Sequence, residues 1–196
     1  MFRPRGFELQ IERLSVKKHR MPMTVDWSSN DAFVAIDFET ANRSRHSACA
    51  VSVVRVDHGS ITKTLTYLIK PPELYFEFTH IHGISLSNVL DAPTFPEIYA
   101  EILNCIEGAH YIAAHNAPFD RSVLKALCLY WQLDLPVLDW RCTVKLARQK
   151  WELFPTKLPD VCRHLGIHLK HHDATSDATA CAQIVMMAAS PKTTSA

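Results

Sequence analysis

The sequence feature that limits the fold most is a run of four consecutive apolar residues, Phe33-Val34-Ala35-Ile36. A strand that is apolar on both of its sides needs cover on both faces of its sheet. The run therefore predicts a central strand in a sheet with helices on both faces. The run leads directly into Asp37-Phe38-Glu39, so this buried strand ends in two carboxylates.

The remaining pattern predicts an α/β fold. Two further strands are expected at residues 48–56 and 61–69, separated by an Asp57-His58-Gly59-Ser60 turn, and another at 111–114. Apolar periodicity predicts helices over residues 95–107, 118–131, 143–151, 158–165 and 175–188. Together these elements predict a mixed five-stranded sheet, three antiparallel strands followed by two parallel ones, flanked by helices.

The chain has 196 residues, of which 47% are hydrophobic and 21% charged, as expected for one globular domain. We place this domain at residues 31–189, with a basic, flexible extension at 1–30 and a short tail at 190–196. The formal net charge of +1 argues against a strongly basic nucleic-acid-binding module. Residues 1–20, however, hold six basic and two acidic residues. They either form part of the extension, the interpretation we favour, or act as an arm that contacts nucleic acid.

No apolar run is long enough for a membrane-spanning helix, and no secretory signal is evident, so no membrane partner is expected. The six cysteines form no CxxC pair, which favours free thiols in a reducing cytoplasm. The cluster of His168, His171 and His172 leaves a zinc site as a minor alternative.

The two carboxylates after the central strand predict a metal site. Asp37 and Glu39 point to the same side of the strand, because side chains alternate along it. Two buried carboxylates repel each other, and a divalent cation with a preference for oxygen ligands, such as Mg²⁺ or Mn²⁺, offsets that cost. A solvated turn after the strand would explain the same pair without a metal.

Two more acidic residues and a histidine occur at helix starts. Pro118 begins a helix and so places Asp120 in the first turn, where the helix dipole alone also favours an acid. Asp177 lies early in the last helix, which Asp173 could cap, and His172 precedes it in a loop. A histidine beside carboxylates suits general-base chemistry, because its ordinary pKa lies near neutrality.

In this order the motifs resemble those of the DEDD exonuclease superfamily, histidine subgroup (DEDDh), which includes the epsilon subunit of DNA polymerase III, ribonuclease T and oligoribonuclease. The motifs are Ile36-Asp37-Phe38-Glu39-Thr40, His115-Asn116-Ala117-Pro118-Phe119-Asp120, and His172 followed after four residues by Asp177. Two further segments, Ile81-His82-Gly83-Ile84 and residues 141–148, are also similar to segments of this family.

The resemblance implies a ribonuclease-H-like exonuclease domain that hydrolyses single-stranded nucleic acid, DNA in preference, from the 3′ end to 5′-mononucleotides. It implies that two Mg²⁺ or Mn²⁺ ions are held by four carboxylates: Asp37, Glu39, Asp120 and Asp177. It assigns the general base to His172. It also implies a set of residues near the terminal nucleotide: Thr40, Ala41, His82, His115 and Asn116.

Several alternatives stay open. One is an exoribonuclease of the same superfamily, and another is a catalytically silent nucleic-acid-binding module on this fold. The family also allows a homodimer, and association with a polymerase is undecided. Arg141, Lys145 and Arg148 recur at helical spacing and could form one phosphate-binding stripe, or simply the polar side of an amphipathic helix.

Overall fold

A computed structural model of the chain describes Trp27 and residues 31–189. The predicted extension and tail therefore lie outside the described residues, apart from Trp27. That side chain packs edge-on against Tyr111, with ring centroids 6.2 Å apart. No helix among the described residues has the length and apolar character that crossing a bilayer requires.

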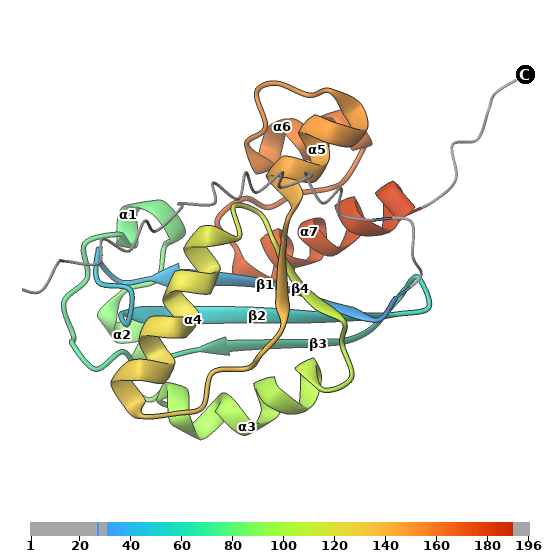
Figure 1. The fold of residues 1–196 in the computed structure, drawn as a ribbon. Coiled ribbons are helices and arrows are strands. Elements are labelled where there is room, and N and C mark those ends of the chain that lie inside the picture. The colour runs from blue at the N-terminus through green and yellow to red at the C-terminus, as the bar shows by residue number, and fades with distance from the viewer. Residues whose placement is uncertain (1–26, 28–30, 190–196) are drawn as a thin grey trace, which may run out of the picture.

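Five strands form one mixed sheet in the order β3-β2-β1-β4-β5 (Figure 1). Their bounds are β1 (Phe33–Thr40), β2 (Ala48–Asp57), β3 (Ser60–Leu68), β4 (Tyr111–Ala114) and β5 (Asp139–Cys142). The first three are antiparallel, and β4 and β5 continue the sheet in parallel with β1. The predicted sheet is confirmed, with the apolar run of β1 at its centre.

Helices cover both faces of the sheet (Figure 1). Their bounds are α1 (Thr79–His82), α2 (Leu86–Val89), α3 (Phe95–Ile106), α4 (Pro118–Trp131), α5 (Thr143–Trp151), α6 (Leu158–Leu165) and α7 (Ala174–Ala189). Pro118 begins α4, and Gly166 ends α6 in the left-handed conformation with φ 69°, both as predicted.

The alternation of side chains along β1 divides the core into two layers. Val34, Ile36 and Phe38 pack on the face covered by α3 and α4. Phe33 and Ala35 pack on the opposite face, under α5, α6 and α7. The next side chains in this second series are those of Asp37 and Glu39, so the strand directs both carboxylates to the α7 side.

Candidate active site

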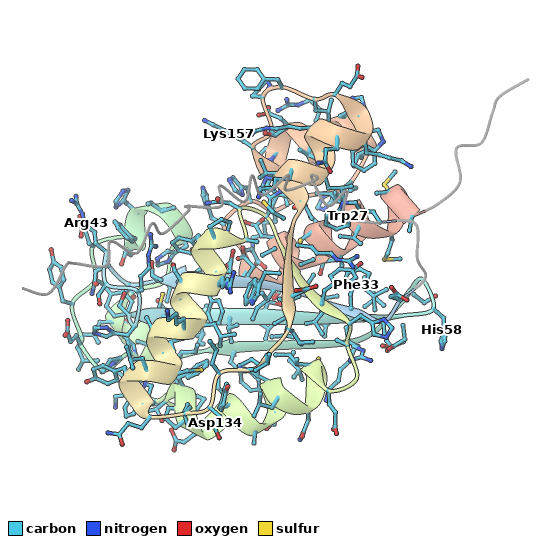
Figure 2. The ribbon with its side chains drawn as sticks, viewed as in Figure 1. Trp27, Phe33, Arg43, His58, Asp134 and Lys157 are labelled. Atoms are coloured by element: carbon cyan, nitrogen blue, oxygen red, sulfur yellow. The ribbon has the colours of Figure 1, made fainter. Side chains whose placement is uncertain are left out.

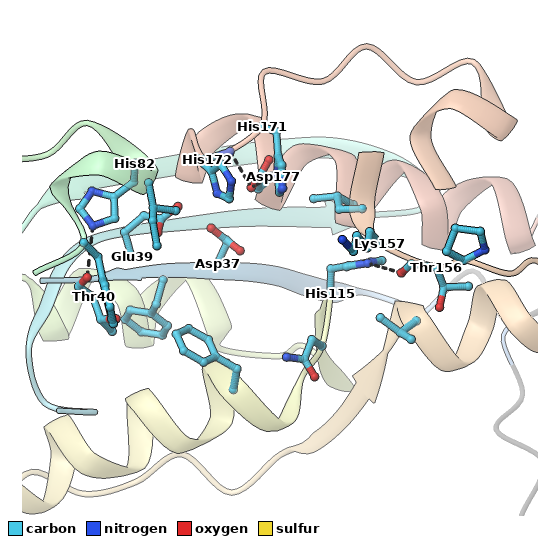
Figure 3. A pocket seen from close by; sticks show the side chains of 18 of the residues that line it. Asp37, Glu39, Thr40, His82, His115, Thr156, Lys157, His171, His172 and Asp177 are labelled. Atoms are coloured by element: carbon cyan, nitrogen blue, oxygen red, sulfur yellow. Dashed lines mark hydrogen bonds and ion pairs between the residues drawn. The ribbon is translucent and has the colours of Figure 1, made fainter. Parts of the chain in front are cut away.

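Three carboxylates meet at the end of β1. Asp37 and Glu39 come from β1 and Asp177 from the first turn of α7, and one ligand oxygen of each lies within 4.8 Å of the others. Figure 3 shows these side chains directed toward one another across the gap between strand and helix. They form the floor of a cleft of about 710 Å³. The structure thus brings together three of the four predicted metal ligands.

The crowding of these groups perturbs their acidity. Burial raises the pKa of Asp37 well above its usual range, and the charges of Asp120, Glu39 and Asp177 raise it further. Burial, followed by the charge of Asp177, raises the pKa of Glu39 to about 7. Burial also raises the pKa of Asp177, against the opposing effect of His171. Without a positive charge between them, the three ionised groups destabilise one another.

A cation fits this arrangement. Oδ1 of Asp177 is buried and has no hydrogen-bond partner, although a buried carboxylate oxygen is costly to leave unpaired. The donor set consists of carboxylate oxygens, which are the ligands that Mg²⁺ and Mn²⁺ prefer. A divalent ion would therefore satisfy the unpartnered oxygen and offset the repulsion.

Asp120 lies beneath this cluster rather than in it. Its side chain is only 1% exposed, and Oδ1 accepts a hydrogen bond of 3.1 Å from the backbone N–H of Phe38. It does not line the cleft, and it is outside the 4.8 Å ligand group. Its charge nevertheless raises the pKa of Asp37, so the two carboxylates are close enough to interact. The hydrogen bond from Phe38 to Asp120 holds the end of β1 in place.

Two adjacent histidines stand over Asp177. Nδ1 of His171 lies 3.1 Å from Oδ2 of Asp177, and the backbone N–H of His172 donates to the same oxygen at 3.1 Å. The imidazole rings stack with centroids 3.8 Å apart. His172 has a φ of 66°, a left-handed conformation that is uncommon outside glycine. Burial and the neighbouring His171 lower the pKa of His172, which favours its neutral, proton-accepting form.

The sequence singled out His172 through the family resemblance, but it gave His171 no role in catalysis. The structure shows that His171 forms the side-chain contact with Asp177. His171, His172 and Asp177 form a second group with metal-ligand spacing among the described residues, and His168 is not part of it.

His115 lines the cleft, but both of its ring nitrogens are engaged. Nε2 lies 3.0 Å from the carbonyl oxygen of Thr156, to which it must donate. Nδ1 therefore accepts from the Thr143 hydroxyl at 2.8 Å. Burial lowers the pKa of His115 to about 4, so the ring is neutral near pH 7. The residue connects the end of β4 to α5 and to the segment before α6.

His82 is held in a similar way. Its Nδ1 accepts from the N–H of Ile84 at 3.1 Å, so Nε2 is the donor to the carbonyl oxygen of Thr40 at 3.2 Å. His82, Thr40 and Asn116 line the cleft as predicted for substrate-binding positions. Ala41 does not line it. Ala41 is fully buried beside Cys49, and its backbone N–H and C=O are both used in internal hydrogen bonds.

The wall formed by α5 and the following loop carries Phe154, which was not identified from the sequence, beside cations that include the candidate Arg148. Phe154 lines the cleft although its side chain is 86% exposed, and Arg148 and Lys157 add positive charge to the same wall. Figure 2 shows Lys157 on this upper part of the molecule. A single helical stripe of Arg141, Lys145 and Arg148, one of the two alternatives for these residues, is not formed. Arg141 lies in β5 and stacks on the ring of Tyr111 at 3.7 Å.

The fold and this site define a class of protein: an α/β domain in which a central strand delivers carboxylates with metal-ligand spacing to the floor of a cleft. The exonuclease family model (RNase_T) matches residues 34–185. The chain belongs to this exonuclease family.

Two curated relatives represent the family. The chain is 31% identical over 165 residues to the PolC-type DNA polymerase III of Clostridium perfringens, a match that covers 81% of this chain and 11% of the relative. It is 30% identical over 151 residues to exodeoxyribonuclease 10 of Escherichia coli (strain K12), covering 72% of this chain and 61% of the relative. The chain thus corresponds to part of the length of each.

Solved structures confirm the ribonuclease-H-like exonuclease fold. Exonuclease X in complex with 5′ overhanging duplex DNA superposes with a TM-score of 0.63 and 26% identity, covering 79% of this chain and 90% of that one. The nuclease domain of 3′hExo, a DEDDh family member bound to rAMP, superposes with a TM-score of 0.70 at 20% identity, covering 82% of this chain and 92% of that one.

Proposed function

We propose that the protein is a metal-dependent 3′→5′ exonuclease that hydrolyses single-stranded DNA to 5′-mononucleotides. The observation that carries the proposal is the carboxylate cluster on the floor of the cleft, with a buried, unpartnered oxygen on Asp177. Membership of the exonuclease family supports a phosphodiester substrate. The name of the related exodeoxyribonuclease 10 supports DNA over RNA.

In this proposal two Mg²⁺ or Mn²⁺ ions would be held by four carboxylates: Asp37, Glu39, Asp120 and Asp177. Asp120 would contribute from beneath the cluster formed by the other three. When bound, such a pair supplies positive charge for the scissile phosphate and favours the deprotonation of water. The buried Oδ1 of Asp177, which has no hydrogen-bond partner, and the raised pKa of Glu39 support this use of the cluster.

The general base in the proposal is His172. It lines the cleft, and its lowered pKa keeps the ring neutral and ready to accept a proton from the attacking water. As the new P–O bond forms, the bond to the leaving 3′ oxygen breaks, and that oxygen is protonated to a hydroxyl. His115 and His82 are not suited to this task, because each ring is held by two hydrogen bonds.

A substrate panel tests the proposal. Matched DNA and RNA oligonucleotides, single-stranded and duplex, are incubated with the full chain and Mg²⁺, Mn²⁺ or a chelator, and the products are separated by chromatography. We expect 5′-mononucleotides from the 3′ end of single-stranded DNA, only with a cation present. Asp37→Ala should abolish the reaction, since it removes a carboxylate from the centre of the proposed metal site.

The outcomes separate the alternatives. Faster hydrolysis of RNA would identify an exoribonuclease, and binding without hydrolysis would identify a silent nucleic-acid-binding module. Robust cleavage by Asp37→Ala, or cleavage that the chelator leaves unaffected, would overturn the metal-dependent mechanism. The homodimer and the polymerase partner stay predictions, to be measured by light scattering and by copurification.

A further inference from the structure

A second hollow of about 400 Å³ lies between α4, β5 and α5, next to the active cleft. Its lining includes three cations, Arg121 and Lys125 of α4 and Lys145 of α5, together with Trp140 and Cys142 of β5. In Figure 1, α4 and β5 run beside each other on the same side of the molecule, with α5 beyond the end of β5. We call this hollow the basic groove.

The charge of the basic groove is not neutralised locally. No acidic residue lines it, and none of its three cations has a carboxylate within 4.0 Å in the part of the chain that the structure describes. By contrast, Arg43, Arg55, Arg163 and Lys170 each form an ion pair with a carboxylate. Unpaired cations gathered in a concave surface create a positive potential that attracts anions.

The basic groove and the active cleft share a wall. Asn116 and Val144 line the cleft, and the adjacent residues Ala117 and Lys145 line the groove. The first residues of α4 and α5 therefore form the wall between the active cleft and the basic groove, and this wall is a single chain segment thick. A polymer whose end occupies the cleft can cross this wall into the groove.

We infer that the basic groove binds the phosphodiester backbone of the substrate, a few nucleotides away from the bond held in the cleft. The inference rests on the proposed function, because it takes nucleic acid as the ligand. The carboxylates of the cleft repel phosphates unless cations are bound, and Arg148 and Lys157 of its wall can reach only the phosphates beside it, so further cations favour the binding of a longer strand. The partly exposed indole of Trp140 offers a flat apolar surface for a base or a sugar.

A charge-matched pair of triple variants tests this inference. Arg121→Gln, Lys125→Gln and Lys145→Gln together neutralise the basic groove. Lys63→Gln, Lys150→Gln and Arg163→Gln together remove the same charge from positions that line neither the groove nor the cleft. Each full-length variant is assayed on a long single-stranded DNA and on the p-nitrophenyl ester of thymidine 5′-monophosphate, which is small enough to occupy the cleft alone.

For the groove variant, we expect kcat/KM on the long strand to fall on the order of tenfold at moderate salt. The slope of log affinity against log salt should become shallower by about 2, as the loss of three phosphate contacts on a single strand predicts. Hydrolysis of the ester should be unchanged. The control variant should show a smaller loss on the long strand. Equal losses in the two variants would overturn the inference.

Binding measured without hydrolysis separates this inference from the proposed function. Fluorescence anisotropy with a non-hydrolysable oligonucleotide reports affinity even if the protein cleaves nothing. If the wild type is inactive but the groove variant alone loses affinity, the groove assignment holds and the exonuclease assignment fails. If the groove variant loses affinity only for duplex DNA with a 5′ overhang, the groove binds the complementary strand. If it loses affinity for single strands, the groove binds the strand that is cleaved.

Cys142 provides a second, local measurement. It is the only one of the six cysteines that is not buried, and it lines the basic groove. Alkylation by iodoacetamide, followed by mass spectrometry, should be slowed by a long non-hydrolysable oligonucleotide and not by thymidine 5′-monophosphate. An unchanged rate in the presence of saturating oligonucleotide would contradict occupation of the groove.

Discussion

At the scale of single residues, His171 and His172 are adjacent and stacked on each other, but their side chains make different contacts. The ring of His171 is tied to Asp177 by an Nδ1 contact of 3.1 Å, whereas only the backbone N–H of His172 contacts that carboxylate. The imidazole of His172 is thus available to accept a proton. The family resemblance implies this role for His172, but the role of its neighbour depends on how the loop folds onto α7.

Alanine substitution of each histidine should separate the two roles. We expect His172→Ala to lower kcat by about 10²-fold or more, as the loss of a general base does, and His171→Ala to lower it by less than about tenfold. His171→Ala should instead change the Mg²⁺ concentration needed for half-maximal activity, because it alters the surroundings of Asp177. Steady-state rates over a Mg²⁺ titration measure both effects. The reverse order of the two kcat losses would assign the general base to His171.

At the scale of elements, segments with strong local signals were predicted closely, and three of the four-residue elements were not. Residues 118–131, 143–151 and 158–165 form helices with the predicted bounds. Proline in the first turn limits the first and third of these locally, and Gly166 ends the third. No bounds were predicted for β5, α1 and α2, because their four residues show no period and do not form a continuous apolar run, as the four residues of β4 do. Their conformation is set by tertiary contacts, which also explains why Arg141 lies in a strand and not on the helical stripe.

The segment between α5 and α6 carries a prediction of its own. Phe154 is 86% exposed at the edge of the cleft, in a position to stack on a base of the substrate. Since base stacking on an aromatic ring contributes about 1–3 kcal/mol, Phe154→Ala should lower kcat/KM on DNA by about tenfold, and Phe154→Trp should preserve it. Val137→Ala is the matched control, because Val137 is 99% exposed and does not line the cleft. Equal rates for the two alanine variants would show that Phe154 makes no productive contact.

At the scale of the whole molecule, the near-neutral net charge of +1 conceals a separation of charge. The carboxylates gather at the end of β1, and three unpaired cations gather in the basic groove across the starts of α4 and α5. The strand ends and helix starts of the sequence predicted the carboxylate cluster, because topology brings such positions to one edge of a sheet. The groove could not be predicted in this way, since it depends on the packing of α4 against β5 and α5.

The global stability of the fold should depend on pH through His115, which connects β4, α5 and the segment before α6. Burial lowers its pKa to about 4 in the folded chain, against about 6.5 when unfolded. As pH falls below about 6.5, the unfolded chain binds a proton that the folded chain excludes until about pH 4. Stability is therefore lost across this window, by about 2 kcal/mol between pH 7 and pH 5.

Urea unfolding at several pH values, with chelator present throughout, isolates this contribution. His115→Gln removes the titrating group. Between pH 7 and pH 5, the decrease in the unfolding free energy of this variant should therefore be smaller than the decrease in the wild type, by about 2 kcal/mol. His58→Gln, in the exposed turn between β2 and β3, should retain the wild-type dependence. The carboxylate cluster titrates alike in all three proteins and cancels in the comparison. A wild-type slope retained in His115→Gln would mean that His115 is accessible to protons in the folded state, contrary to its two internal hydrogen bonds.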